Sequence, residues 1–204
     1  MIAIIDYGVG NLFSLCSSLK YIGRDAVVTG DEAVIGRCDK MLLPGVGAFA
    51  DAAGKLREGR LDEFIVKEAA SGKPLLGVCL GMQLLFDKSL EFGAHAGLGL
   101  IPGAVVPINQ SIPKKLKVPH IGWNALIFQG GGKSSLFKYI SEGDHVYFVH
   151  SYHTQPSGDA VIATTEYGAE LTAAVASGNI YGTQFHPEKS GEVGLNILRA
   201  FAEI

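Results

Sequence analysis

The sequence predicts an α/β protein built on a central, mostly parallel sheet with helices on both faces and an added mixed or antiparallel portion. Apolar, strand-like runs alternate with helical patterns up to residue 79, which is typical of parallel strands covered by helices. Short strand-like runs separated by Gly, Ser and Asn dominate the second half. The chain has 204 residues, 48% hydrophobic and 18% charged. We therefore expect a single domain over residues 1–204 with a sizeable core.

The first half contains four predicted strands and two predicted helices. The runs MIAIID, DAVVTG, DKMLLPG and PLLGVC predict buried strands at residues 1–6, 25–30, 39–45 and 74–79. A helix is predicted over residues 11–22, because Leu12, Leu15, Leu19 and Ile22 lie on one stripe. A long helix is predicted over about residues 50–70, with Gly72 ending it.

The second half contains predicted short strands and a final helix. The strands correspond to the runs GLGLIPGAVVPI, VPHIGWNALIF, HVYFVHSY, AVIATTEYG, ELTAAVASG and NIYGTQFHPE. A helix is predicted over about residues 190–202. No internal repeat and no linker interrupts the chain, which favours one domain with a mixed sheet.

Composition argues against several classes of protein. The net charge is −3 and the densest basic run, KKLK at residues 114–117, is short, so we expect no nucleic-acid partner. No apolar run reaches the ~18–20 residues needed to span a bilayer. Three cysteines (Cys16, Cys38 and Cys79) form no disulfide framework. The N-terminus lacks the features of a signal peptide. These observations predict a cytoplasmic protein.

Three motifs resemble cofactor or metal sites but fail on inspection. GVGNLF at residues 8–13 has Phe13 where a dinucleotide fingerprint needs its third glycine. GGGKSS at residues 130–135 lacks the earlier glycine of a phosphate loop, and a flexible surface turn is expected. In HVYFVHSYH (145–153), an extended strand would place His145 and His153 about 27 Å apart at ~3.3 Å per residue. We therefore expect no cofactor and no metal.

The segment GVCLGMQLLF at residues 77–86 indicates a nucleophile. A cysteine between Gly77 and Gly81 at a strand-to-helix joint has the Gly-x-nucleophile-x-Gly pattern of an elbow, where bulk at either glycine would clash. The following helix N-terminus favours the thiolate of Cys79, which is the reactive form. The Leu80 N–H is positioned to face a developing oxyanion. The alternative is that Cys79 is a small buried core residue.

A base for this nucleophile is predicted in QFHPEKS. His186 and Glu188 are two residues apart at the end of a strand, so their side chains leave on the same face. Glu188 can then orient one ring nitrogen of His186 while the other faces the sulfur. A second oxyanion donor is expected in LLPGVGAF, where Gly45 and Gly47 allow bare backbone to approach a ligand. The N–H of Val46 or Gly47 is the candidate donor.

In their order along the chain, LLPGVGAF, GVCLGMQLLF and QFHPEKS resemble the motifs of the triad-type, class I glutamine amidotransferases. The resemblance implies a flavodoxin-like fold of that family and a Cys79–His186–Glu188 triad. It also implies attack of Cys79 on the side-chain amide of glutamine, a glutamyl thioester, and release of ammonia and glutamate. More of the chain, including DYGVGNL, PHIGWN, YFVHSYH and FHPEKSG, resembles the glutaminase subunits of imidazole glycerol phosphate synthases. That likeness covers residues 2 to about 200 and implies a role in histidine biosynthesis.

The resemblance also implies further sites. Substrate-binding positions would be Gly45, Gln83, Glu91, Ser151 and Tyr152. Positions at the interface with a (β/α)8-barrel cyclase subunit, which uses the ammonia to make imidazole glycerol phosphate and AICAR, would be Asn11, Trp123, Asn124, Tyr147 and His150. Structural alternatives are that Gln83 is a polar helix-surface residue, Trp123 a core anchor and Glu91 a solvated charge.

Three other functions remain open from the sequence. A glutaminase paralogue that feeds another acceptor synthase would keep all these motifs, whereas anthranilate, GMP and pyridoxal-phosphate glutaminases should lack PHIGWN. A cysteine-elbow redox sensor would give His186 and Glu188 no role. A plain binding module would leave both the elbow and the His-Pro-Glu segment unexplained.

Overall fold

The side chains of the first strand point alternately into two hydrophobic clusters, which lie on the two faces of the sheet. The structure is a computed structural model that describes residues 1–130 and 133–204. In β1 (Ile2–Ile5), Ala3 and Ile5 pack into one core cluster, while Ile2 and Ile4 pack into another. Successive side chains of a strand point to opposite faces. This strand is therefore buried on both sides, as the continuous apolar run predicted.

Within the described residues, the main sheet has eight strands, and the first five are parallel. These are, in spatial order, β2 (Ala26–Thr29), β1, β3 (Lys40–Gly45), β4 (Leu75–Cys79) and β14 (Ile180–Thr183). Antiparallel strands extend the sheet beyond β14 in the order β13 (Glu170–Ser177), β12 (Val161–Glu166) and β9 (Ile127–Phe128). The predicted fold class, a mostly parallel sheet with an antiparallel portion, is confirmed.

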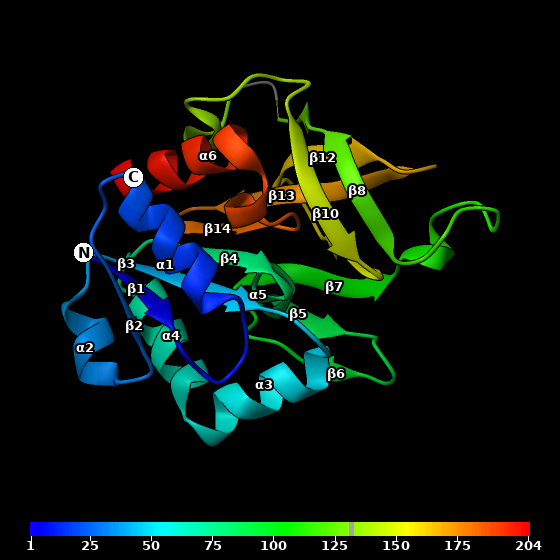
Figure 1. Ribbon diagram of the computed structural model, residues 1–204. Coiled ribbons are helices and arrows are strands. Elements are labelled where there is room, and N and C mark those ends of the chain that lie inside the picture. Colours follow the sequence, from blue (N-terminus) through cyan, green and yellow to red (C-terminus); the bar gives the residue numbers. More distant parts are fainter. Residues whose placement is uncertain (131–132) are drawn as a thin grey trace.

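Helices cover both faces of the parallel strands, and Figure 1 shows α6 and α3 on opposite sides. One face carries α2 (Glu32–Arg37), α3 (Phe49–Glu58) and α4 (Leu61–Ala70), which contribute to the cluster of Ala3 and Ile5. The other carries α1 (Leu12–Tyr21) and α6 (Gly191–Glu203), which contribute to the cluster of Ile2 and Ile4.

Two smaller sheets stand beside the carboxyl end of β4. A mixed four-stranded sheet has the order β11 (Tyr152–Pro156), β7 (Ile101–Pro107), β5 (Phe86–Ser89) and β6 (His95–Ala96). An antiparallel pair joins β8 (His120–Ala125) to β10 (His145–His150). Short helical turns are α5 (Leu80–Leu84), η1 (Ile108–Gln110), η2 (Ser135–Phe137) and η3 (Pro187–Lys189).

The prediction of one helix over residues 50–70 is wrong. The segment forms α3 and α4, which are separated by Gly59 and Arg60. Arg60 has a φ of 58°, in the left-handed region, and this turn ends the first helix. Gly59 has a low helix propensity and marks the break. The helix α2 was not predicted, because six residues are too few to establish a periodic apolar stripe.

The segment HVYFVHSYH is not one extended strand, so that expectation is also wrong. The chain leaves β10 after His150 and enters β11 at Tyr152, in a different sheet. His145 is exposed, whereas His150 and His153 are both buried. No set of three or more side chains suited to a metal is found among the residues that the structure describes.

Two further expectations concern the GGGKSS turn and membrane-spanning segments. Part of the predicted GGGKSS turn, residues 131–132, lies outside the described residues. Within residues 1–130 and 133–204, no helix has the length and apolar character that crossing a membrane requires.

Candidate active site

Cys79 lies at a sharp turn between β4 and α5. Its φ is 56° and its ψ is −113°, a backbone conformation that residues with a side chain rarely adopt. Strain of this kind is typical of functional positions. The strand-to-helix joint predicted from the Gly-x-Cys-x-Gly spacing is present, although the helix that follows is only five residues long.

Close backbone packing explains the glycines around Cys79. A Cβ on Gly81 would lie 1.9 Å from the Leu43 carbonyl oxygen, and a Cβ on Gly77 would lie 2.6 Å from the Gly81 carbonyl oxygen. A Cβ on Gly45 would lie 2.7 Å from the Gly81 nitrogen. These three glycines allow β3, β4 and α5 to meet without side chains between them. The turn therefore depends on all three.

His186 and Glu188 lie beside Cys79. Nδ1 of His186 is 2.9 Å from Oε1 of Glu188, and the side chains are 3% and 1% exposed. Ser190 accepts from the Tyr147 N–H at 2.9 Å and donates to the His186 carbonyl at 2.7 Å, which holds the turn after β14 in place. The structure thus brings the three predicted triad residues together.

The pKa of His186 results from opposing influences. Burial lowers the pKa, but the neighbouring Cys79 sulfur and Glu188 carboxylate both favour the imidazolium. Together they raise the pKa of His186 to about 9. An imidazole that gains a proton readily at this position is suited to accept one from a thiol and return it to a leaving amine.

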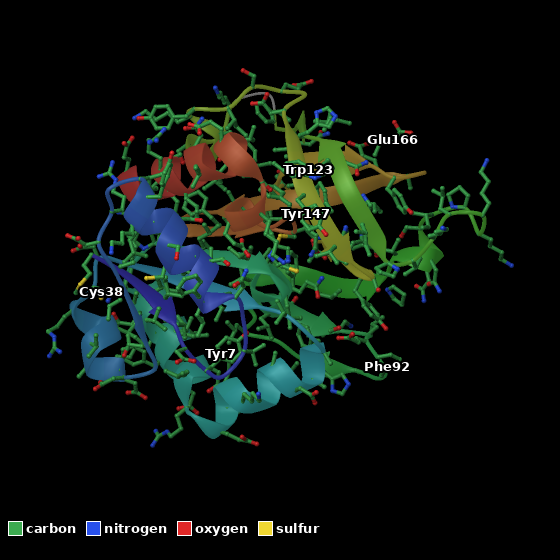
Figure 2. All side chains as sticks on the ribbon, in the orientation of Figure 1. Tyr7, Cys38, Phe92, Trp123, Tyr147 and Glu166 are labelled. Atoms are coloured by element: carbon green, nitrogen blue, oxygen red, sulfur yellow. The ribbon has the colours of Figure 1, made fainter. Side chains whose placement is uncertain are left out.

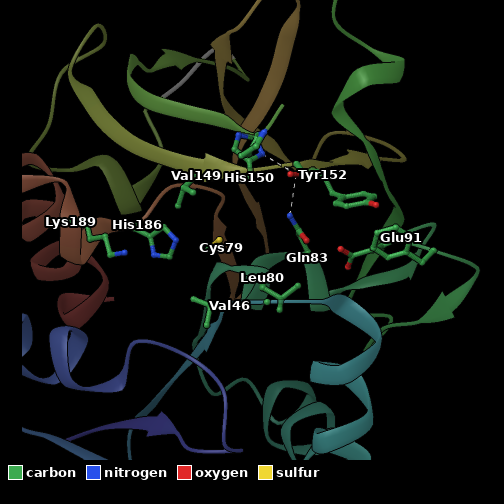
Figure 3. A pocket seen from close by; sticks show the side chains of 14 residues that line it. Val46, Cys79, Leu80, Gln83, Glu91, Val149, His150, Tyr152, His186 and Lys189 are labelled. Atoms are coloured by element: carbon green, nitrogen blue, oxygen red, sulfur yellow. Dashed lines mark hydrogen bonds between the residues drawn. The ribbon is translucent and has the colours of Figure 1, made fainter. Parts of the chain in front are cut away.

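A cavity of about 740 Å³ opens in front of the sulfur. Figure 3 shows its walls. Among the residues predicted from sequence, those lining it are Val46, Gly47, Cys79, Leu80, Gln83, Glu91, His150, Ser151, Tyr152 and His186. Its size suits a small-molecule substrate. Gly45 does not line the cavity among the described residues, and its observed role is the close packing against Gly81.

Gln83 is buried and takes part in a polar network, so it is not a helix-surface residue. Its Nε2 donates to the Gln184 Oε1 at 2.9 Å and to the Tyr152 carbonyl at 3.2 Å. Gln184 lies with its Nε2 3.8 Å from the Cys79 sulfur. Gln184 was missed in the sequence. It stands two residues before His186, and this strand-end spacing is the signal that could have found it.

Glu91 is tied to a helix terminus. Its Oε2 accepts from the Phe49 N–H, at the start of α3, at 2.6 Å. A carboxylate there satisfies a backbone donor and interacts favourably with the helix dipole. The carboxylate also lines the cavity, so Glu91 is not merely a solvated charge.

Several contributors to this site were not predicted. Phe92, which is 90% exposed, and Lys189 both line the cavity. Tyr7 is buried and donates from its hydroxyl to the Pro44 carbonyl at 2.7 Å. Burial, and then the nearby Cys79, raise the pKa of Tyr7. Tyr7 therefore braces the strand end that carries Val46 and Gly47.

The residues predicted for a partner interface fall into two groups. Trp123 is 53% exposed, so it is not a core anchor, and the centroid of its ring lies 5.9 Å from that of Tyr147. Figure 2 labels both residues, on the paired strands β8 and β10. Asn124 and Asn11, which precedes α1, are half-buried. His150 is only 6% exposed and faces the cavity. His150 therefore lines the cavity instead of standing on the exposed surface, and its role as an interface or gate position stays a prediction.

The fold, the elbow and the buried His–Glu pair match a known family of enzymes. The family model described as glutamine amidotransferase class-I matches residues 3–203. The chain belongs to this family.

Curated relatives that match along almost the whole chain share the name of one subunit. A protein of Methanothermobacter thermautotrophicus, named imidazole glycerol phosphate synthase subunit HisH, is 51% identical over 100% of this chain and 98% of its own. Proteins of the same name are 47% identical in Syntrophotalea carbinolica, over 100% of both chains, and 48% identical in Bacillus mycoides, over 98% and 93%.

Solved structures agree on the fold. A structure titled "Crystal structure of glutamine amidotransferase" has a TM-score of 0.75 at 18% identity and covers 100% of this chain and 99% of its own. The structure of PurLQS from Thermotoga maritima has a TM-score of 0.75 at 20% identity, with coverages of 99% and 97%. At such identities the likeness concerns the fold alone.

Proposed function

We propose that this chain is the glutaminase subunit of an imidazole glycerol phosphate synthase and acts in histidine biosynthesis. The observation that carries the proposal is the cavity in which Cys79 faces a buried His186–Glu188 pair. The 47–51% identity to relatives named HisH over the full chain supports the narrower assignment.

The chemistry follows from the roles of the three side chains. His186 takes the Cys79 proton, and the thiolate attacks the side-chain amide carbon of L-glutamine. The N–H of Leu80, with that of Val46 or Gly47, stabilises the oxyanion. His186 returns its proton to the leaving nitrogen, and ammonia departs from a glutamyl thioester. His186 then removes a proton from water as the water oxygen attacks the thioester carbon. The C–S bond breaks, glutamate leaves, and His186 returns the proton to the Cys79 sulfur.

The substrate is held by groups that surround the sulfur. Gln83, Glu91, Ser151 and Tyr152 line the same cavity as Cys79, and we assign them to the α-amino and α-carboxylate ends of glutamine. Lys189, which lines the cavity near His186, adds a cation. Gly45 serves the site indirectly by letting β3 approach the elbow.

The ammonia passes to a partner, for which we propose a (β/α)8-barrel cyclase subunit. Ile121 and Trp123 point outward from β8 with 58% and 53% of their surface exposed, and Val46 and Phe92 are exposed at the cavity. Exposed apolar side chains of this kind are typical of a protein interface. Free ammonia would become ammonium near neutral pH, so direct transfer preserves the nucleophilic form. We place the enzyme in the cytoplasm, with no membrane or nucleic-acid partner.

We expect slow glutamine hydrolysis by the chain alone. A rotated peptide in the PGVG segment (residues 44–47) would remove one oxyanion donor, an effect of ~3–4 kcal/mol. Binding of the nucleotide ligand to the partner would restore that donor. Gly47 is exposed and has a φ of 90°, and no atom lies within 4 Å of where its Cβ would stand, so neighbouring side chains do not crowd this part of the segment.

The test is glutamate release by the purified chain, alone and with the barrel cyclase of the same genome plus its ribulosyl-carboxamide ligand. Cys79→Ala is the blank, and Cys16→Ser, a half-buried cysteine on α1, is the matched control. A rate that rises only in the full mixture supports the proposal. A rate unchanged by the cyclase points to another acceptor synthase. No hydrolysis in any mixture would refute glutaminase activity.

A further inference from the structure

Two buried histidines outside the triad form a hydrogen-bonded pair. Nδ1 of His120 lies 3.0 Å from Nε2 of His150. His120, on β8, is stacked against the rings of Phe148 and Tyr167 at centroid distances of 5.1 and 4.1 Å. His150, at the end of β10, lines the cavity. The mechanism above uses neither imidazole.

The outer end of the pair reaches the exposed segment of β8. Nε2 of His120 lies 2.8 Å from Oδ1 of Asn124, whose Nδ2 donates to the Glu166 carbonyl at 2.9 Å. A carbonyl can only accept, so it turns the amide with its oxygen towards His120. Asn124 directly follows the exposed Trp123. The pair is therefore connected to the surface for which we propose a partner.

The inner end reaches the substrate cavity. Nδ1 of His150 lies 2.9 Å from the Tyr152 carbonyl, which also accepts from Gln83. Figure 3 shows these two contacts meeting at the carbonyl oxygen. Gln83 continues through Gln184 to the Cys79 sulfur. Polar contacts thus run without a gap from Asn124 to the nucleophile.

The two histidine rings carry too few N–H protons to make all three of their contacts hydrogen bonds. Asn124 Oδ1 and the Tyr152 carbonyl are both acceptors, so each end of the pair needs a proton, and the contact between the rings needs a third. Two neutral imidazoles carry two. A third proton would make one ring an imidazolium in a buried place.

The environment of the two rings disfavours the uptake of a third proton. Burial lowers the pKa of His150 to about 3, and the other ionisable groups that act on it are the imidazoles of His120, His153 and His186. No carboxylate of the described residues is among these groups. Burial also lowers the pKa of His120, although the hydrogen bond to Asn124 raises it. We therefore infer that both imidazoles are neutral, which leaves one of the three contacts without a proton.

We propose that His120 and His150 are positioning residues for glutamine binding, and that the Asn124 amide decides which end of the pair holds the proton. With the amide oxygen facing His120, both rings carry their proton on Nε2, and the Tyr152 carbonyl receives none from His150. With the amide turned, both rings carry it on Nδ1 and His150 donates to that carbonyl. The Tyr152 carbonyl contacts Gln83, so the orientation of the Asn124 amide at the β8 surface affects a residue that lines the cavity.

The change between the two arrangements conserves protons. One proton leaves Nε2 of His120 for water, and the proton between the rings moves from His150 to Nδ1 of His120. One proton from water arrives at Nδ1 of His150. Both arrangements hold two protons on two rings. The role assigned to Gln83 rests on the proposed function, whereas the proton positions do not.

The test is the ¹⁵N spectrum of the histidine rings in the full chain, which distinguishes protonated from bare ring nitrogens. The wild type should show Nε2–H on His120 and His150. Asn124→Leu removes the acceptor and should shift both to Nδ1–H, while Asn124→Asp keeps an acceptor and should keep Nε2–H on His120. His153→Gln changes a buried histidine outside the pair, whose Nε2 contacts Ser111, and should leave both signals in place.

Kinetics supply the second readout. Asn124→Leu should lower the KM for glutamine about threefold with kcat changed less than about twofold, in line with one modest hydrogen bond gained at the Tyr152 carbonyl. Combining it with His150→Phe should abolish this KM change.

Two spectroscopic results would overturn the proposal. One is that the ring protons stay on Nε2 in Asn124→Leu, and the other is that they move to Nδ1 in Asn124→Asp as they do in Asn124→Leu. Should Asn124→Leu fail to fold, Asn124→Ala removes the same acceptor. A wild type without glutaminase activity would refute the proposed function, and the spectra would still decide the proton positions.

Discussion

Nδ1 of His186 lies 2.9 Å from Oε1 of Glu188 in a setting where both side chains are almost wholly buried. The remaining carboxylate oxygen, Oε2, has no hydrogen-bond partner among the described residues. The buried negative charge of Glu188 is therefore balanced chiefly by His186. This dependence favours the protonated ring and fixes its orientation.

Replacing Glu188 by Gln should leave the fold intact and impair catalysis. The amide keeps the shape of the side chain but no longer stabilises the imidazolium or selects its tautomer. We expect kcat for glutamine hydrolysis to fall by about 10²–10⁴-fold, the range typical of losing a base or its orienting carboxylate. Glu192→Gln, an exposed change on α6, should keep kcat within about twofold. Equal activity of the two variants in a glutaminase assay would contradict the role of Glu188.

The raised pKa of His186 predicts a pH dependence of stability. The folded value of about 9 exceeds the ordinary 6.5, so between these values the folded protein binds more protons than the unfolded chain. The stabilisation from His186 is fully present below about pH 6.5 and is lost as the pH rises through about 9. Urea unfolding at several pH values measures it. In His186→Gln the free energy of unfolding should fall less over this pH range than in the wild type, whereas His145→Gln, a change at an exposed residue, should behave like the wild type. The same pH dependence in the wild type and both variants would disprove the expectation.

Gly81→Ala should be among the most damaging small substitutions in this chain. Its Cβ would lie 1.9 Å from a backbone oxygen of β3, where no flexible side chain can yield. We expect a loss of at least about 3 kcal/mol in the free energy of unfolding, at the upper end of what overpacking costs. Gly54→Ala is the matched control, because it lies within α3 with open space around its Cβ. That change should stabilise by about 0.5–1 kcal/mol. Similar unfolding free energies for both would show that the elbow can relax.

Tyr7→Phe should disturb the oxyanion side of the cavity. It removes the hydroxyl that donates to the Pro44 carbonyl and leaves that acceptor unpaired, at a cost of about 1–3 kcal/mol. Because Pro44 precedes the candidate oxyanion donors, we expect kcat to fall by about 10–100-fold through misplacement. Tyr21→Phe, on a side chain that is 78% exposed, serves as the control. If thermal stability falls but kcat does not, Tyr7 only supports the strand.

The parts of the fold that sequence predicts well are those set by local pattern. The apolar runs of β1, β3 and β4 and the stripe of α1 each identify an element without reference to the rest of the chain. The failures occur where a single residue breaks a pattern. Arg60 divides one apparent helix, and the chain changes sheets at Ser151 with no glycine or proline to mark it.

The same distinction holds for the candidate site. The Gly-x-Cys-x-Gly and His-Pro-Glu spacings are short enough to be read directly, and the structure brings them together. The contact between Gln83 and Gln184 joins residues 101 positions apart, so no local spacing encodes it. The exposure of Trp123 and the burial of His150 depend on how β8 and β10 pair, which strand periodicity leaves undetermined.

The pairing of β4 with β14 also has a consequence for how the protein is made. Cys79 leaves the ribosome long before Gln184, which is 105 residues further along the chain. Until then one edge of β4 has no neighbouring strand, and the sulfur lacks the surroundings that the completed sheet provides. Non-local pairing of this kind slows folding. The nascent chain therefore passes through a period in which an unpaired strand edge invites aggregation and its thiol is open to oxidation.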